Sequence, residues 1–167
     1  MDENPFTIRA ITEADKDYLQ MGLSQMTKES RRLRFFSSIK ALTNKELDYF
    51  TKVDQHNHLA YVAIFNGISP AGSIRCVRNN KRSEFAELAV TIVDKFHHQG
   101  LGFRMLETLA SAAIKEKITH LYGDFHASNV NMLKLLQKYC QLHNIPTDSF
   151  QLKHKDDGFL YFEMALA

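Results

Sequence analysis

The sequence has few of the residues that mark several large classes of protein. Only two of its 167 residues are cysteines, Cys76 and Cys140. Neither belongs to a CxxC pair, so no zinc or redox motif is indicated, and a reduced chain is the simpler expectation, with one disulfide left open. No apolar run is long enough to span a bilayer, and the acidic N-terminus lacks the apolar stretch of a signal peptide. We therefore expect a cytoplasmic protein with no membrane partner.

An excess of one charge is also missing. The chain has 21 Lys and Arg against 19 Asp and Glu, a formal net charge of +2. Such a small balance does not indicate a nucleic-acid-binding protein, and local basic stretches such as ESRRLRFF are typical of a solvated face. With 44% hydrophobic residues and no repeat or linker, the chain is long enough for one core. We expect a single domain over residues 1–167.

Hydrophobic periodicity and capping residues predict a mixed sheet with helices on its faces. Thr12 and Thr43 precede two helical patterns, and the segment 28–36 is predicted to be helical at its start. The order is one strand, two helices, three strands, then a helix, a strand, a helix and a closing hairpin, which is not a regular βαβ repeat. The predicted strands are 6–11, 58–66, 72–79, 83–94, 120–126, 150–155 and 159–166.

The stretch FHHQGLG, residues 96–102, lies between a predicted strand and a predicted helix. Backbone N–H groups at a helix start have no partner inside the helix, and the helix dipole favours an anion there. Gly100 and Gly102 would let the backbone approach such an anion, so the stretch is a candidate phosphate cradle. No Lys-Ser or Lys-Thr follows, which excludes a P-loop, and Met105 stands where a dinucleotide fingerprint has its third glycine. A tight strand-to-helix turn without a ligand remains the alternative.

The longer stretch VTIVDKFHHQGLGFRML resembles motif A of the GNAT-type N-acetyltransferases. That motif is Arg or Gln, two residues, Gly, one residue, then Gly or Ala, and His97 departs from it. The resemblance implies that the backbone here binds the pyrophosphate of acetyl-CoA and that the preceding strand end binds its pantetheine arm. The cofactor-binding residues implied in this stretch are Ile92, Val93, His97, His98, Gln99, Gly100, Leu101, Gly102 and Phe103.

The resemblance extends over nearly the whole chain. SNVNMLKLLQKYC is similar to the family's Asn-x-x-Met helix, which implies cofactor contacts for Asn129 and Met132, although Asn129 is equally suited to cap the helix. Upstream, SRRLRFF and AELAVTIVD are similar to the acetyltransferase domain of bacterial protein-lysine acetyltransferases. The implied fold is α/β (α+β): a mostly antiparallel sheet of about seven strands flanked by about four helices, splayed between 86–94 and 120–126.

Glu87 is the candidate general base. It interrupts the apolar strand FAELAVTIV and shares a face with Ala89 and Thr91 by the two-residue period of a strand. Apolar surroundings would raise its pKa toward the range useful for taking a proton from an amine. The resemblance places a catalytic glutamate here, whereas a solvent-facing or ion-paired glutamate is the alternative. Leu136 occupies the family's usual position for a tyrosine acid, and Tyr139 is more typical of the core.

These residues leave three functions open. The leading hypothesis is an acetyl-CoA-dependent N-acetyltransferase acting on a primary amine, with a protein lysine as acceptor. The alternatives are an acetyltransferase for small amines and a non-catalytic acyl-CoA sensor. The histidines match no standard zinc spacing, so no metal is expected, and a homodimer is left open.

Overall fold

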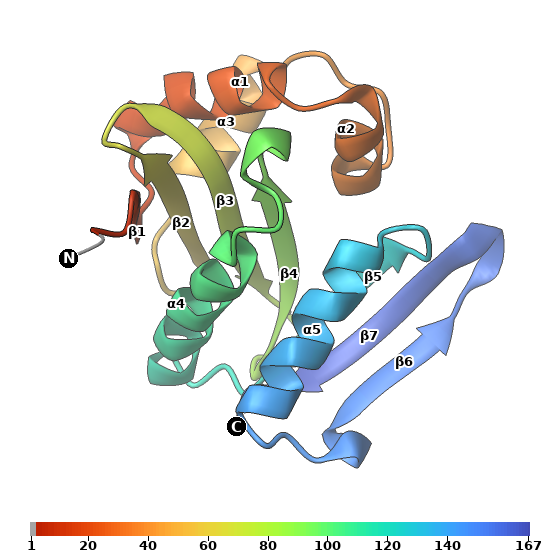
Figure 1. The fold of residues 1–167 in the computed structure, drawn as a ribbon. Coiled ribbons are helices and arrows are strands. Elements are labelled where there is room, and N and C mark those ends of the chain that lie inside the picture. The colour runs from red at the N-terminus through yellow and green to blue at the C-terminus, as the bar shows by residue number, and fades with distance from the viewer. Residues whose placement is uncertain (1–2) are drawn as a thin grey trace.

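The structure, a computed structural model, describes residues 3–167. Seven strands and five α-helices account for most of the chain (Figure 1). The strands are β1 (Phe6–Ala10), β2 (His58–Phe65), β3 (Ser69–Arg78), β4 (Phe85–Ile92), β5 (His120–His126), β6 (Phe150–His154) and β7 (Phe159–Ala165). The helices are α1 (Lys16–Ser24), α2 (Lys28–Phe35), α3 (Asn44–Thr51), α4 (Leu101–Lys115) and α5 (Val130–Leu142).

The strands form one sheet in the order β1-β2-β3-β4-β5-β7-β6. Every neighbouring pair is antiparallel except β4 and β5, which are parallel. The predicted fold class and the predicted seven strands are therefore confirmed. There are five helices rather than about four, because the basic segment forms a helix of its own, α2. Thr27 begins it by accepting the N–H of Ser30 at 3.1 Å.

Helices cover both faces of the sheet. In Figure 1, α4 and α5 lie side by side in front of it, whereas α1, α2 and α3 gather around its upper end. The predicted apolar stripe of α4 is buried in the main core: Leu101, Met105, Leu106, Leu109 and Ala113. Smaller apolar clusters join β2 to α1 and α1 to α3 on the other face. Two separate apolar layers therefore enclose β2, β3 and β4.

Two predicted strand boundaries were wrong. The strand predicted for 72–79 already begins at Ser69, so the chain turns only at 66–68, and a bulge at Ala63 and Ile64 accommodates Pro70. The long strand predicted for 83–94 ends at Ile92, because a short 3₁₀ turn, Asp94–Phe96, follows it. That turn redirects the chain from β4 toward the start of α4.

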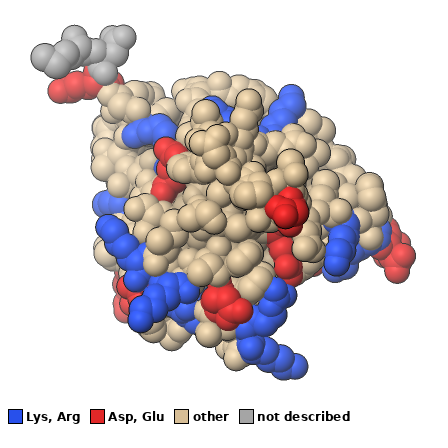
Figure 2. All heavy atoms as spheres, turned by 90° about the horizontal axis from the view of Figure 1, so that it is seen from below, with Lys and Arg blue, Asp and Glu red and all other residues tan. Residues whose placement is uncertain are grey.

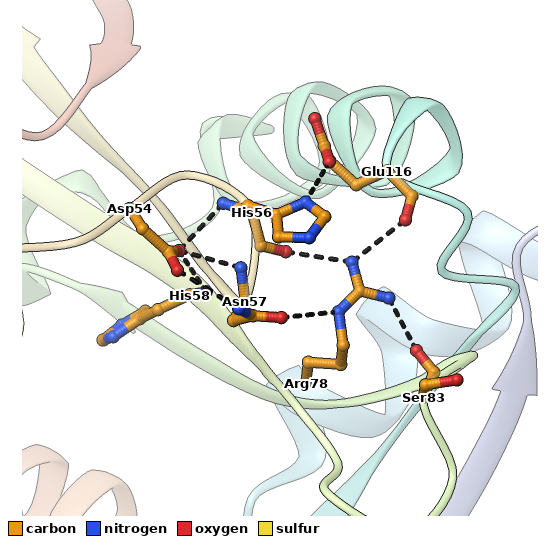
Figure 3. Close-up of polar contacts among 7 residues, drawn as sticks. All are labelled: Asp54, His56, Asn57, His58, Arg78, Ser83 and Glu116. Atoms are coloured by element: carbon orange, nitrogen blue, oxygen red, sulfur yellow. Dashed lines mark hydrogen bonds and ion pairs between the residues drawn. The ribbon is translucent and has the colours of Figure 1, made fainter.

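The loop that precedes β2 is tied down by its own polar groups (Figure 3). The Asp54 carboxylate accepts the backbone N–H groups of His56, Asn57 and His58 at 2.8–3.0 Å, and these bonds lower the pKa of Asp54 to about 2. The guanidinium of Arg78 donates to Asn57 and to the carbonyls of His56, Ser83 and Glu116. This network joins β2, β3 and the end of α4.

Figure 2 shows one face of the molecule, on which Lys and Arg side chains alternate with Asp and Glu. No single sign of charge dominates that face, in keeping with the small net charge. Among residues 3–167, no helix is both long enough and apolar enough to cross a membrane.

Candidate active site

The two parallel strands separate after a short paired stretch. Pairing joins only Phe85–Glu87 of β4 to His120–Tyr122 of β5, yet β4 continues to Ile92 and β5 to His126. Figure 1 shows the two strands diverging toward the top of the sheet. Gly123 sits at the point of divergence, where an added Cβ would lie 3.4 Å from the Leu88 carbonyl oxygen. This opening lies where the sequence predicted a splayed strand pair.

The backbone of β4 presents unpaired groups to this opening. Val93 donates its N–H to Ala71 and accepts from Phe96, so its own groups are already used. Because backbone groups alternate in direction along a strand, those of Leu88, Val90 and Ile92 point away from β3 toward β5. Of the two residues predicted to contact the pantetheine arm, Ile92 has its N–H directed toward the opening, whereas the backbone N–H and carbonyl of Val93 are bonded within the protein.

The start of α4 closes one end of the opening. Gly100 is the N-cap residue, with φ +76° and no side-chain cap, and the first intrahelical bond comes from Arg104. The N–H groups of Leu101, Gly102 and Phe103 therefore have no partner among residues 3–167. An added Cβ on Gly102 would lie 3.8 Å from Leu135 of α5. Free donors, an open glycine and a first turn without acidic residues fit a diphosphate.

Two side chains of the loop are hydrogen-bonded to backbone carbonyls of the protein. His97 donates a ring N–H to the carbonyl of Ile92 at 2.9 Å, and Gln99 donates to the carbonyl of Lys95 at 3.1 Å. The first contact fastens the loop to the end of β4, and the second fastens it to the 3₁₀ turn at Asp94–Phe96. His98 adopts φ +59°, a left-handed conformation unusual for a residue with a side chain. What the loop offers a ligand is therefore its backbone.

The start of α5 forms the other wall. Asn129 is its N-cap, and its Oδ1 accepts the N–H of Met132 at 3.2 Å. The capping role predicted for Asn129 is confirmed, and its cofactor contact stays a prediction, as does that of Met132. Tyr139 is buried, and its hydroxyl donates to the Leu166 carbonyl at 3.1 Å. Tyr139 is therefore a core residue, as its helical spacing indicated.

Glu87 lies where the opening begins, in the last residue pair that joins β4 to β5. Its side chain is exposed and makes no hydrogen bond or ion pair with any residue in the range 3–167. The expected apolar enclosure was wrong, because no element covers this part of the strand. The carboxylate is instead free to meet a molecule that arrives from solvent.

Helix α2 is fixed above the opening at both of its ends. Asp94, just after β4, accepts the N–H and hydroxyl of Thr27 and the hydroxyl of Ser30, and these bonds help lower the pKa of Asp94 against the effect of burial. Phe36 packs edge-on against Phe159 of β7, 5.1 Å between ring centroids. The helix therefore spans from β4 to β7, across the separated strands.

Helix α2 and β3 bring two arginines to the same face as Glu87. Arg34 donates to the Thr91 hydroxyl at 2.8 Å, and Arg75 lies opposite Ala89 in the sheet register. The basic stretch that contains Arg34 was interpreted as a solvated face, and Arg75 was not predicted as a site residue. Its own strand gives no signal for Arg75, because Arg75 alternates with the buried residues Ile74 and Cys76.

Other polar residues near the opening are paired within the protein. Asp124 forms an ion pair with Lys155 at 3.0 Å, and His126 is bonded to Ser128 at 2.6 Å. Within residues 3–167, no group of three or more His, Cys, Asp or Glu side chains is arranged to hold a metal ion.

Comparison with known proteins identifies the family of this chain. The profile of a family described as "Acetyltransferase (GNAT) domain" matches residues 6–139. Acetyltransferase PA5475 of Pseudomonas aeruginosa is 26% identical over 89% of this chain and 81% of its own length. Acetyltransferase Pat of Mycolicibacterium smegmatis is 23% identical over 80% of this chain, which spans only 40% of that protein.

Solved structures show the same fold. The GNAT domain of S. lividans PAT has a TM-score of 0.82 at 22% identity, covering 95% of this chain and 89% of that one. The Salmonella typhimurium protein yncA, solved with its cofactor acetyl-CoA, has a TM-score of 0.73 at 14% identity, covering 98% and 95%. Since the family profile matches well over half of the sequence, the chain belongs to the GNAT family of acetyltransferases.

Proposed function

We propose that this protein transfers an acetyl group from acetyl-CoA to a primary amine on a protein lysine side chain, with Glu87 as general base. The observation that carries the proposal is the free, exposed carboxylate of Glu87 where β4 and β5 separate. A lysine side chain that extends from a folded partner needs an approach from solvent, and an exposed carboxylate permits it.

The chemistry requires the amine to lose a proton before it attacks. The pKa of a lysine is about 10.4, so at neutral pH the acceptor arrives as an ammonium ion without a free electron pair. Glu87 would take that proton, directly or through one water. Acetyl-CoA supplies the activated acyl group as its thioester.

The remaining residues bind and orient. The free N–H groups of Leu101, Gly102 and Phe103 would hold the diphosphate, and the inward-facing backbone of Leu88, Val90 and Ile92 would hold the arm. Fixing both reactants beside each other supplies much of the rate gain in such a transfer. No tyrosine stands at the family's usual acid position, because Leu136 is there and is fully buried. The departing thiolate would be protonated by solvent.

A second candidate, a small amine, is favoured by one observation. A cavity on the face of the sheet that carries Glu87 is lined by Arg34 and Arg75. A cavity suits a small amine, whereas a protein lysine needs an open groove. A protein lysine and a free small amine both need the base, so Glu87 does not distinguish them.

Replacement of Glu87 by Gln tests the proposed base. We expect kcat to fall on the order of 100-fold, the lower end for a lost general base, while affinity for acetyl-CoA stays unchanged. Thiol release with a lysine peptide, followed from pH 6 to 9, measures kcat, and calorimetry measures the affinity. Glu84→Gln is the matched control, because Glu84 is also exposed and lies just before β4. A wild-type rate and pH profile in Glu87→Gln would remove Glu87 from the mechanism. Binding of acetyl-CoA without acetylation of any amine would favour the sensor.

A further inference from the structure

Two arginines flank a small residue on the sheet face that carries Glu87. Arg75 of β3 lies opposite Ala89, which is the next residue after Glu87 on that face of β4. Arg34 of α2 reaches the following residue on the face, Thr91, through a 2.8 Å bond from its Nε to the hydroxyl. The guanidinium of Arg75 lies over the Phe50 ring and that of Arg34 over the Phe35 ring, and both arginines line the same cavity.

Arg75 is buried without a counter-charge. Arg75 is only 4% exposed, and it forms no ion pair with any acidic residue in the range 3–167. One nitrogen, Nη1, donates to the Phe50 carbonyl at 3.0 Å and to Nε2 of His58 at 3.0 Å, and the group stacks on the Phe50 ring. No bond to a protein group occupies Nε or Nη2.

The neighbours of Arg75 add no negative charge. His58 accepts from Arg75, so its ring is neutral, and burial followed by the nearby Arg75 lowers the pKa of His58 to about 4. Burial and the proximity of Arg34 lower the pKa of Arg75 to about 9. Burial lowers the pKa of Arg34 to about 10, which Glu87 partly offsets. A buried cation without an ion-pair partner is unfavourable, and Arg75, with Arg34 nearby, therefore indicates that an anion belongs there.

There is space for that anion. A cavity of about 50 Å³ lies between the sheet and α1 and α2. Both arginines and the hydroxyls of Ser73 and Thr91 line it, with apolar walls around them. A carboxylate matches a space of this size, and the planar fork of an arginine matches a carboxylate in geometry as well as charge.

Arg78 shows what a structural arginine looks like in this protein. It lies on the same strand, three residues from Arg75, and its three nitrogens donate to four different oxygens (Figure 3). Its donors are used by the fold. Arg75 donates hydrogen bonds from one nitrogen only, and it lines the cavity. A purely structural role does not explain donors left without a protein partner.

We propose that Arg75 and Arg34 form a carboxylate-binding subsite of the acceptor pocket, so that the preferred acceptor is a primary amine that also carries a carboxylate. This rests on the proposed function. Arg34 lies close enough to Glu87 for their charges to interact, so an acceptor with its amine at Glu87 and its carboxylate at the two arginines needs only a short chain between them. That chemistry has two sources: a free amino acid with a short chain, or a protein lysine beside an acidic residue.

Paired acceptors that differ only in the carboxylate test the proposal. One arm compares 5-aminovalerate with pentylamine, and the other compares a lysine peptide flanked by Asp with the same peptide flanked by Asn. We expect the acidic member of one pair to have a higher kcat/KM by about 10- to 100-fold, the range for a hydrogen-bonded charge pair. The arm that shows the preference identifies the source of the carboxylate.

Variants locate the preference. Arg75→Met and, on a different element, Arg34→Gln should each reduce it about 10-fold or more while acetylation of the neutral acceptor persists. Arg78→Met is the matched control and should keep the preference. Equal kcat/KM within both pairs for the wild type, or a preference that survives in both Arg75→Met and Arg34→Gln, would overturn the subsite.

A binding measurement separates this proposal from the proposed function. Glutarate, a dicarboxylate without an amine, should raise the thermal midpoint of the wild type and leave that of Arg75→Met unchanged. This readout needs no turnover. If no amine is acetylated but glutarate still binds through Arg75, the proposed function fails and the subsite stands. If amines are acetylated and glutarate shifts neither protein, the subsite fails alone.

Discussion

Polar groups in the loop before β2 have hydrogen-bond partners within the protein, whereas several polar groups at the opening between β4 and β5 have none. In the loop, Asp54 accepts three backbone N–H groups and Arg78 reaches four oxygens, so the donors and acceptors are matched within the protein. At the opening, the first N–H groups of α4, the carboxylate of Glu87 and most of the Arg75 guanidinium have no protein partner. Matched groups hold the fold together, and unmatched groups mark where a ligand binds.

The largest effect is expected at the unmatched donors of α4. Gly102→Glu would place a side chain and a negative charge where the diphosphate must approach, and affinity for acetyl-CoA should fall by roughly 100-fold or more. Calorimetry measures the affinity. Gly102→Ala is the control for folding, because its Cβ would meet Leu135 at an ordinary contact distance of 3.8 Å and should leave the thermal midpoint unchanged. Unaltered affinity in Gly102→Glu would exclude this loop from the site.

In the loop before β2, a substitution should lower stability without changing the affinity for acetyl-CoA. Asp54→Ala removes the acceptor of three N–H groups, and the free energy of unfolding should fall by about 1–2 kcal/mol, as for a lost helix cap. Affinity for acetyl-CoA should not change. Urea unfolding and calorimetry on one sample test both statements. Glu84→Ala, which removes an exposed carboxylate that accepts no hydrogen bond, should match the wild type in both.

The smallest expected effect is a loss of folding stability at acid pH. His58 is held neutral, with a pKa of about 4, whereas an unfolded histidine has a pKa near 6.5. Between these values the unfolded chain binds a proton that the folded chain does not, so stability falls as the pH falls from about 6.5 to 4. His58→Gln should lose less stability than the wild type between pH 7.5 and pH 5, measured as urea midpoints. An identical pH dependence would contradict the neutral state inferred from its bond with Arg75.

Local patterns predicted much of the fold. The spacing of Leu101, Met105 and Leu109 identified the buried face of α4, and Asn129 was identified as a cap because its side chain acts on its own helix. The position of the cradle followed from glycine chemistry at a strand-to-helix junction. These features depend on residues close together in sequence, which is why the sequence reveals them.

Features that depend on distant segments were missed. The period of β4 placed Glu87, Ala89 and Thr91 on one face, but it did not show that α2 covers Thr91 and leaves Glu87 exposed. Arg75 alternates with the buried residues Ile74 and Cys76, so its own strand predicts an exposed side chain. Only the packing of Phe50 and α2 over that face buries it. A single strand does not encode what lies above it.

A crystal structure of this protein with coenzyme A tests the central claim most directly. We predict a diphosphate on the N–H groups of Leu101, Gly102 and Phe103, the arm between β4 and β5, and the sulfur on the same side of the sheet as Glu87. A coenzyme bound elsewhere, with that turn of α4 making no contact to phosphate, would contradict the account.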